Sequence, residues 1–148
     1  MRAHNSNENE FVETITLDEF FKLIDYFTPN ETEAEFYTGI KINDENDAKL
    51  SAKKLINMGI KKVIITLGEK GLFYLDSKEE IYMKASPVKA IDTTGAGDAF
   101  NGGFSYALLK GKKIKECLEI ANKVAGLSTT KLGAGDSMPT FKDINLKV

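Results

Sequence analysis

The chain has 148 residues, of which 42% are hydrophobic and 28% charged, as is typical of a globular domain with its own core. Its formal net charge is −2 and its pI about 5.5, which argues against nucleic acid as the main partner, because phosphate-backbone binding requires a basic surface. The single cysteine, Cys117, excludes an internal disulfide and is predicted to be buried. No apolar run reaches membrane-spanning length, and residues 1–10 contain no hydrophobic signal segment. We therefore expect one domain, no membrane contact and a cytoplasmic location.

Helices and strands alternate in the first half of the predicted structure. Residues 1–13 are polar, contain the only histidine, and are predicted to form a disordered tail. A capping-box pattern begins the first helix at Thr16, and Pro29 ends the strand that follows it. The expected elements are helix 17–25, strand 26–28, helices 30–39 and 44–58, and strand 63–67, the last buried on both faces.

After Gly71 the hydrophobic pattern changes to short strands and then to helices. Strands are predicted at 72–75, 81–83 and 88–91, and helices at 97–110 and 113–130. This order of elements favours a layered α/β sheet.

The segment Asp92-Thr93-Thr94-Gly95-Ala96-Gly97-Asp98 joins the last predicted strand to a helix. Its two glycines allow a tight turn and close backbone approach to a ligand. Unpaired N–H groups at the start of the helix suit a phosphate. A carboxylate beside a bound anion is electrostatically unfavourable unless it has a function there. Accepting a proton from an attacking hydroxyl is such a function. The alternative is a plain turn in which Asp98 interacts only with the helix dipole.

This segment resembles the D-T-x-G-A-G-D signature of the ribokinase-like sugar kinases, the PfkB carbohydrate kinase family, and the likeness is dense over residues 92–104. The resemblance implies a ribokinase-like layered α/β sheet and ATP-dependent phosphoryl transfer to a sugar hydroxyl. It also implies that Asp98 is the catalytic base and that Gly95, Ala96 and Gly97 form the anion hole. The chain has no P-loop or protein-kinase motif.

A second segment, which begins at Pro29, resembles the N-x-x-E motif of the same family, with Asn30 and Glu33 in the named positions. The resemblance implies that they organise Mg²⁺ and phosphate, in part through water, as Mg²⁺ chemistry allows. A capping box between the same two residues explains the pattern equally simply. Taken alone, the motif favours capping. Because the first signature is also present in this chain, we favour the functional interpretation.

Three further features are interpreted through the resemblance. Thr66, Gly68 and Gly71 match a T-L-G-x-x-G segment that borders the nucleotide, although a strand-to-hairpin turn would need the same glycines. Asn122 matches a position that lines the adenine pocket. Gly-Ala-Gly-Asp occurs again at 133–136, where Pro139 prevents a long helix. This loop resembles one that holds adenine and K⁺, which implies K⁺ ligands at Asp92, Thr94, Gly133 and Ser137.

The resemblance covers residues 17–139 and only the C-terminal half of the family pattern, without its sugar-binding motifs. Two functions therefore remain open: a part of a sugar kinase that is complete only with its other half, or a stand-alone nucleotide-binding or assembly module. Removal of a neighbouring half would expose a strand edge, which we expect at 26–28 and 63–67. A homo-oligomer or a partner chain is the expected consequence, and a sugar would bind only with the missing half.

Overall fold

The apolar run at 63–67 forms the first strand of a small three-stranded sheet. The computed structural model describes residues 15–144, so the predicted tail at 1–13 lies outside the described residues. Strand β1 (Val63–Thr66) pairs antiparallel with β2 (Leu72–Leu75), and β2 pairs antiparallel with β3 (Glu80–Met83). The first three residues of β1 are fully buried, which confirms the prediction of a strand covered on both faces.

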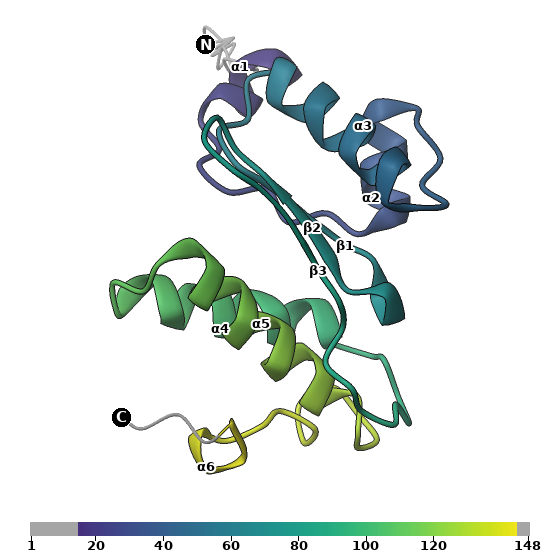
Figure 1. Ribbon diagram of the computed structural model, residues 1–148, viewed down its shortest axis with the longest axis vertical. Coiled ribbons are helices and arrows are strands. Elements are labelled where there is room, and N and C mark those ends of the chain that lie inside the picture. The colour runs from purple at the N-terminus through teal and green to yellow at the C-terminus, as the bar shows by residue number, and fades with distance from the viewer. Residues whose placement is uncertain (1–14, 145–148) are drawn as a thin grey trace, which may run out of the picture.

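Helices cover both faces of this sheet, and so the expected layered α/β arrangement is present (Figure 1). On one face Val63 and Ile65 pack in a core with α1 (Leu17–Lys22), α2 (Glu31–Thr38) and α3 (Glu45–Asn57). On the other face Ile64 packs with α4 (Ala96–Leu109) and α5 (Ile114–Ser128). Cys117 is completely buried in this second core, as predicted.

The predicted helices agree with the structure apart from their ends. Asn30 caps α2 at its start and Gly39 at its end, and Asp44 begins α3. The first helix is shorter than predicted and stops at Lys22. The chain turns early there because the carbonyl of Ile24 accepts a hydrogen bond from the N–H of Lys61.

Two of the predicted strands differ from the structure. Residues 26–28 are only partly a strand, since two isolated parallel bridges, Phe27 to Val63 and Asn30 to Thr66, replace a continuous ladder. Pro29, which has no N–H, lies between them. Residues 88–91 form no strand, because the N–H groups of Ile91 and Asp92 both donate to the carbonyl of Thr129 at the end of α5.

The remaining elements complete the C-terminal region. A short 3₁₀ helix, η1 (Gly68–Lys70), follows β1, and α6 (Phe141–Ile144) lies beyond the end of α5. The second Gly-Ala-Gly-Asp copy is a loop, as its proline predicted. Within residues 15–144, no helix has the length and apolar character needed to cross a membrane.

Candidate nucleotide-binding site

A cleft of about 530 Å³ opens where β1 ends, between the first turn of α4 and the middle of α5. Half of the candidate residues named from the sequence line it, and they come from four separate segments of the chain. These residues are Asn30, Thr66, Gly68, Gly71, Ala96, Gly97 and Asn122. The fold thus brings together, at the carboxyl end of a strand, residues that are up to 92 positions apart in the sequence. Ligands of open α/β sheets bind at this end of the strands.

The first turn of α4 presents free N–H groups at the cleft. Gly95 precedes the helix in a left-handed conformation with φ of 78°, which favours glycine. The N–H of Ala96 donates to the carbonyl of Thr93 at 3.2 Å. Within residues 15–144, the N–H groups of Gly97 and Asp98 donate to no backbone carbonyl. These two donors, rather than that of Ala96, are therefore available to an anion.

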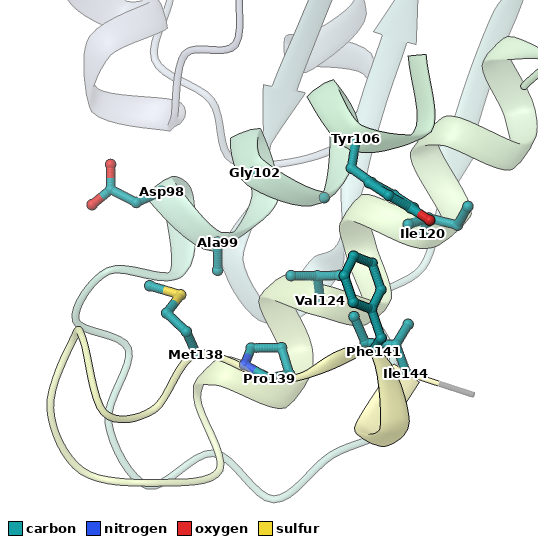
Figure 2. A pocket seen from close by; sticks show the side chains of 11 residues that line it. Asp98, Ala99, Gly102, Tyr106, Ile120, Val124, Met138, Pro139, Phe141 and Ile144 are labelled. Carbon is teal, nitrogen blue, oxygen red and sulfur yellow. The ribbon is translucent and has the colours of Figure 1, made fainter. Parts of the chain in front are cut away.

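The carboxylate of Asp98 lies beside the cleft and not in it. Asp98 is exposed and borders a smaller cavity of about 230 Å³ on the outer side of α4 and α5. Figure 2 shows its side chain pointing away from the apolar lining of that cavity, which includes Val124, Met138 and Phe141. Such a lining does not suit a sugar, because it offers few hydrogen-bond partners to hydroxyl groups. The carboxylate is open to a reactant that approaches from outside this chain.

Asn30 and Glu33 form the capping box that was the alternative interpretation of their motif. The side-chain oxygen of Asn30 accepts from the N–H of Glu33, and a Glu33 carboxylate oxygen accepts from the N–H of Asn30, both at 2.9 Å. Asn30 nevertheless lines the cleft, whereas Glu33 does not. Within the described part of the chain, no three His, Cys, Asp or Glu side chains are grouped to hold a metal.

The loop after β1 is shaped by its glycines. Gly71 has φ of 111°, and a Cβ there would lie 1.9 Å from the carbonyl oxygen of Met83. Gly71 is therefore required by the fold itself, as the turn interpretation supposed. The ammonium of Lys70 donates to the carbonyl of Asn43 at 2.8 Å, and Lys70 is not among the residues that line the cleft.

Asn122 joins α5 to the segment that follows β3. Its side-chain nitrogen donates to the carbonyl of Lys84 at 2.7 Å, which leaves its oxygen as an acceptor beside the cleft. The wall next to it, residues 85–90, was missed in the sequence because a strand was predicted at 88–91. The signal in the sequence is Gly126, a glycine inside a predicted helix, because a Cβ there would lie 3.0 Å from the Cβ of Ser86 in this wall.

Asp92 connects the two loops in which K⁺ ligands are expected. One carboxylate oxygen accepts from the N–H of Thr94 at 2.9 Å and the other from the N–H of Gly133 at 3.0 Å. Hydrogen bonds from the Thr94 side chain and N–H, and then from Gly133, lower the pKa of Asp92 to about 2. The carbonyls of Thr94 and Gly133 accept no backbone hydrogen bond within residues 15–144. Hard oxygen atoms of this kind suit a monovalent cation. Ser137 is buried nearby and donates to Ala134.

The chain is similar to known sugar kinases over most of its length. A family model for pfkB family carbohydrate kinases matches residues 6–141. The ribokinase of Haemophilus influenzae is 47% identical over 129 residues, which cover 87% of this chain and 42% of that protein. A deoxyribokinase of Salmonella typhi is 34% identical over 121 residues, which cover 82% of this chain and 40% of that protein.

The fold shows the same likeness. A structure of Arabidopsis thaliana ribokinase complexed with ribose and ATP matches with a TM-score of 0.82 and 34% identity, covering 86% of this chain and 42% of that one. The chain therefore has the ribokinase-like α/β fold and spans about two fifths of the length of the relatives it matches.

Proposed function

Because the chain belongs to the pfkB family of carbohydrate kinases, we propose that it supplies the nucleotide site and the catalytic base of an ATP-dependent sugar kinase. The observation that carries the proposal is the cleft in which four separate segments meet around the free N–H groups of α4. The names of the relatives, ribokinase and deoxyribokinase, favour a pentose as the acceptor.

The first turn of α4 separates the two reactants in this proposal. The terminal phosphate of ATP lies in the cleft against the N–H groups of Gly97 and Asp98, where the helix terminus favours negative charge. The sugar hydroxyl approaches from the exposed side, and the Asp98 carboxylate takes its proton. Phosphoryl transfer depends mainly on such positioning and on stabilisation of the developing charge.

Two cations belong to the proposal. Mg²⁺ would neutralise charge on the phosphates, and Asn30 and Glu33 would orient its water ligands. K⁺ would be bound between the two loops that Asp92 joins, by the oxygens of Thr94, Gly133 and Ser137. The role of this chain is to fix those loops, since Asp92 holds one backbone N–H from each of them.

Titration calorimetry of the purified chain with MgADP tests the nucleotide site. We expect weak binding. At millimolar ADP it should give heat on titration and, in a separate melting experiment, a rise in the unfolding temperature. Gly97→Val should abolish both, because a β-branched side chain would block the approach to the helix N–H groups. Gly102→Val is the matched control: neither glycine has an atom within 4 Å of a built Cβ, but only Gly97 lines the cleft. A wild-type chain that gives no heat and no thermal shift would contradict the proposal.

The second candidate function is a nucleotide-binding or assembly module without transfer activity. The observation that favours it is that Glu33 caps α2 and does not line the cleft, as a plain capping box would predict. Assays of ATP turnover with ribose and deoxyribose, with and without the rest of a ribokinase, discriminate the two. A module would bind nucleotide and remain inactive in both cases.

A further inference from the structure

One wall of the cleft is the loop at 67–71, which joins β1 to β2. Four residues in and next to this loop line the cleft, namely Thr66, Gly68, Glu69 and Gly71. Within the loop, the N–H of Lys70 donates to the carbonyl of Leu67 at 3.0 Å, and the N–H of Gly71 donates to that of Gly68 at 3.1 Å. These hydrogen bonds are local, and residues 68–70 at the tip of the loop are exposed. The position of the tip therefore depends on contacts with other segments.

Lys70 attaches this tip to two other parts of the molecule. Its ammonium donates to the carbonyl of Asn43 at 2.8 Å, and its own carbonyl accepts from the phenol of Tyr82 on β3 at 2.9 Å. The first of these is a charge-assisted hydrogen bond, which is stronger than a neutral one. Lys70 does not line the cleft, whereas its neighbour Glu69 does. The two attachments therefore act on the wall of the cleft from outside the site.

The segments to which Lys70 is attached are themselves held in place. Asn43 precedes α3, and the carboxylate of Asp47 accepts from its N–H at 2.9 Å and from its side-chain nitrogen at 3.1 Å. These hydrogen bonds lower the pKa of the Asp47 carboxyl, which stays charged at neutral pH. Helix α3 is in turn joined to β3 by the ion pair of Lys49 and Glu80, whose Nζ and Oε1 atoms lie 2.6 Å apart. A continuous series of polar contacts thus connects α3, through Asn43 and Lys70, with the wall of the cleft.

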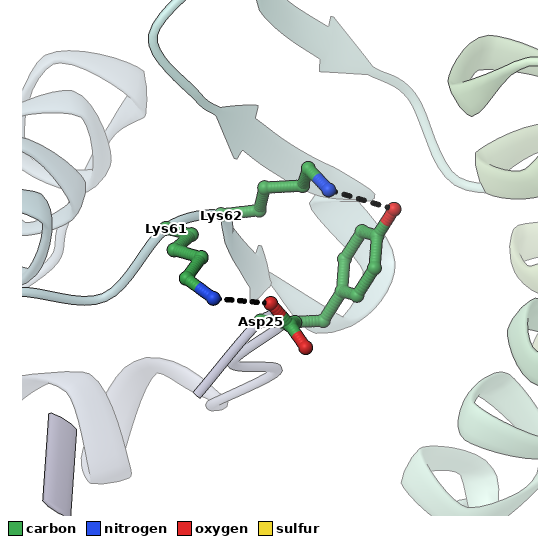
Figure 3. A network of polar contacts seen from close by, with 4 residues as sticks. Asp25, Lys61 and Lys62 are labelled. Atoms are coloured by element: carbon green, nitrogen blue, oxygen red, sulfur yellow. Dashed lines mark hydrogen bonds and ion pairs between the residues drawn. The ribbon is translucent and has the colours of Figure 1, made fainter. Parts of the chain in front are cut away.

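Two lysines at the other end of β1 make similar contacts far from the cleft. Lys61 pairs with Asp25 at 2.8 Å, and the ammonium of Lys62 lies 3.2 Å from the phenol oxygen of Tyr26 (Figure 3). None of these four residues lines the cleft. Lys61 is therefore a matched control for Lys70, since both are exposed and both donate over 2.8 Å.

We propose that Lys70 is a positioning residue of the nucleotide site. By fixing the tip of the loop to Asn43 and Tyr82, it holds this wall of the cleft in place before a nucleotide arrives. A wall that is already ordered does not have to be ordered on binding, and the nucleotide binds more tightly for that reason. The attachment of the loop follows from the hydrogen bonds alone, whereas the effect on the nucleotide rests on the proposed function.

Three variants test this role by titration calorimetry with MgADP. Lys70→Met removes the ammonium and keeps a side chain of similar length. We expect its affinity to fall about fivefold, less than a buried charge-assisted hydrogen bond would give, because the contact is exposed. Lys70→Arg keeps a charged donor and should restore most of the affinity. Lys61→Met loses a hydrogen bond of the same length and should bind as the wild type does.

Two further measurements separate positioning from a general effect on stability. Urea unfolding should show Lys70→Met and Lys61→Met to have similar free energies of unfolding, since each loses one exposed contact. Hydrogen exchange of the chain without nucleotide reports on the loop itself. The amide of Gly71, which donates to Gly68 within the loop, should exchange about threefold faster or more in Lys70→Met and remain unchanged in Lys61→Met.

Asp47 tests the series of contacts behind Lys70. Asp47→Ala frees Asn43, and we expect it to lower the affinity for MgADP about twofold in the wild-type chain. In a chain that already carries Lys70→Met it should have no further effect, because its influence on the cleft passes through the lysine. Such non-additivity is the mark of coupled residues. Glu45→Ala removes a charge from the same turn of α3 and is the control in both backgrounds.

The results distinguish this inference from the proposed function. A wild-type chain that binds no MgADP overturns both. If the wild type binds and Lys70→Met binds equally well, or if Lys61→Met loses as much affinity, only the inference is overturned. It is also overturned if Lys70→Met loses affinity while the exchange of the Gly71 amide is unchanged, because the lysine would then act on the nucleotide directly and not through the loop.

Discussion

Asp92 and Asp98 belong to the same glycine-rich turn, but their carboxylates have different environments. Asp92 accepts hydrogen bonds from two loops and stays charged at any physiological pH. Asp98 is exposed and lies beside two free N–H groups. The first arrangement suits a structural anchor, and the second suits a group that must meet an outside reactant.

Asp98→Asn tests the role of the exposed carboxylate. In a fusion of this chain with the rest of the Haemophilus ribokinase, we expect the variant to bind MgADP normally and to lose about 10²-fold or more of kcat, because an amide cannot accept the proton. Steady-state kinetics together with calorimetry separate the two effects. Retention of more than about a tenth of kcat would exclude Asp98 as the base.

Asp92 gives a prediction for the dependence of stability on pH. Its folded pKa, about 2, lies below the ordinary value of 3.8. Its contribution to stability is therefore present above about pH 4 and is lost as the pH falls towards 2. Urea unfolding should show Asp92→Asn to be less stable than the wild type at pH 6, with a smaller difference at pH 2.5. Asp136→Asn, in the neighbouring loop, is the control, and a difference that does not change with pH would contradict the assignment.

The sequence predicted the residues of the cleft better than their exact roles. Gly71, for example, was named from its match to a T-L-G-x-x-G segment, and it lines the cleft at a position where φ of 111° favours glycine. The pattern at Asn30 could not separate capping from ligand binding, because both need the same side chains at the same spacing. The N–H of Ala96 donates to the carbonyl of Thr93, and no sequence pattern indicates this hydrogen bond.

At the scale of elements, α4 and α5 pack closely because of one glycine. A Cβ at Gly103 would lie 2.9 Å from Val124 Cγ2, whereas a Cβ at Gly102 would meet no atom within 4 Å. We expect Gly103→Ala to destabilise the chain by ~1–3 kcal/mol through overpacking. Gly102→Ala should instead stabilise it by ~0.5–1 kcal/mol through helix propensity. Urea denaturation measures the free energy of unfolding of both variants. Equal changes for the two substitutions would show that α4 and α5 accommodate a methyl group at Gly103 without overpacking.

Element prediction succeeded where one face or both faces were buried within the chain. The fully buried run that gives β1 and the capped helices α2 and α3 are examples. It failed at 88–91, where the N–H of Ile91 donates to the carbonyl of Thr129 at the end of α5 instead of pairing with a strand. The expected edge at 63–67 was also wrong, because β1 is paired with β2 on one side and bridged by Phe27 and Asn30 on the other.

At the scale of the whole molecule, the cleft proposed for the nucleotide lies between several segments of the chain, whereas the carboxylate proposed as the base is exposed. The cleft has walls from separate segments, while the Asp98 carboxylate faces away from the apolar cavity that it borders. We expect the isolated chain to bind MgADP and to phosphorylate neither ribose nor deoxyribose above the uncatalysed background. Phosphorus NMR after prolonged incubation measures this, and formation of a sugar phosphate would show that the chain builds an acceptor site of its own.

The same asymmetry predicts where sugar preference originates. If the proposed function is correct and the sugar is held outside this chain, this chain contributes the phosphate donor site and the base but not the choice of acceptor. Two fusions test this, one with the remaining part of the Haemophilus ribokinase and one with that of the Salmonella typhi deoxyribokinase, which this chain matches at 47% and 34% identity. The ratio of kcat/KM for ribose and deoxyribose should follow the origin of the added part, because specificity is a difference in transition-state binding at the acceptor. The Asp98→Asn variant of each fusion controls for contaminating kinases. The same ratio in both active fusions would place the acceptor contacts on this chain.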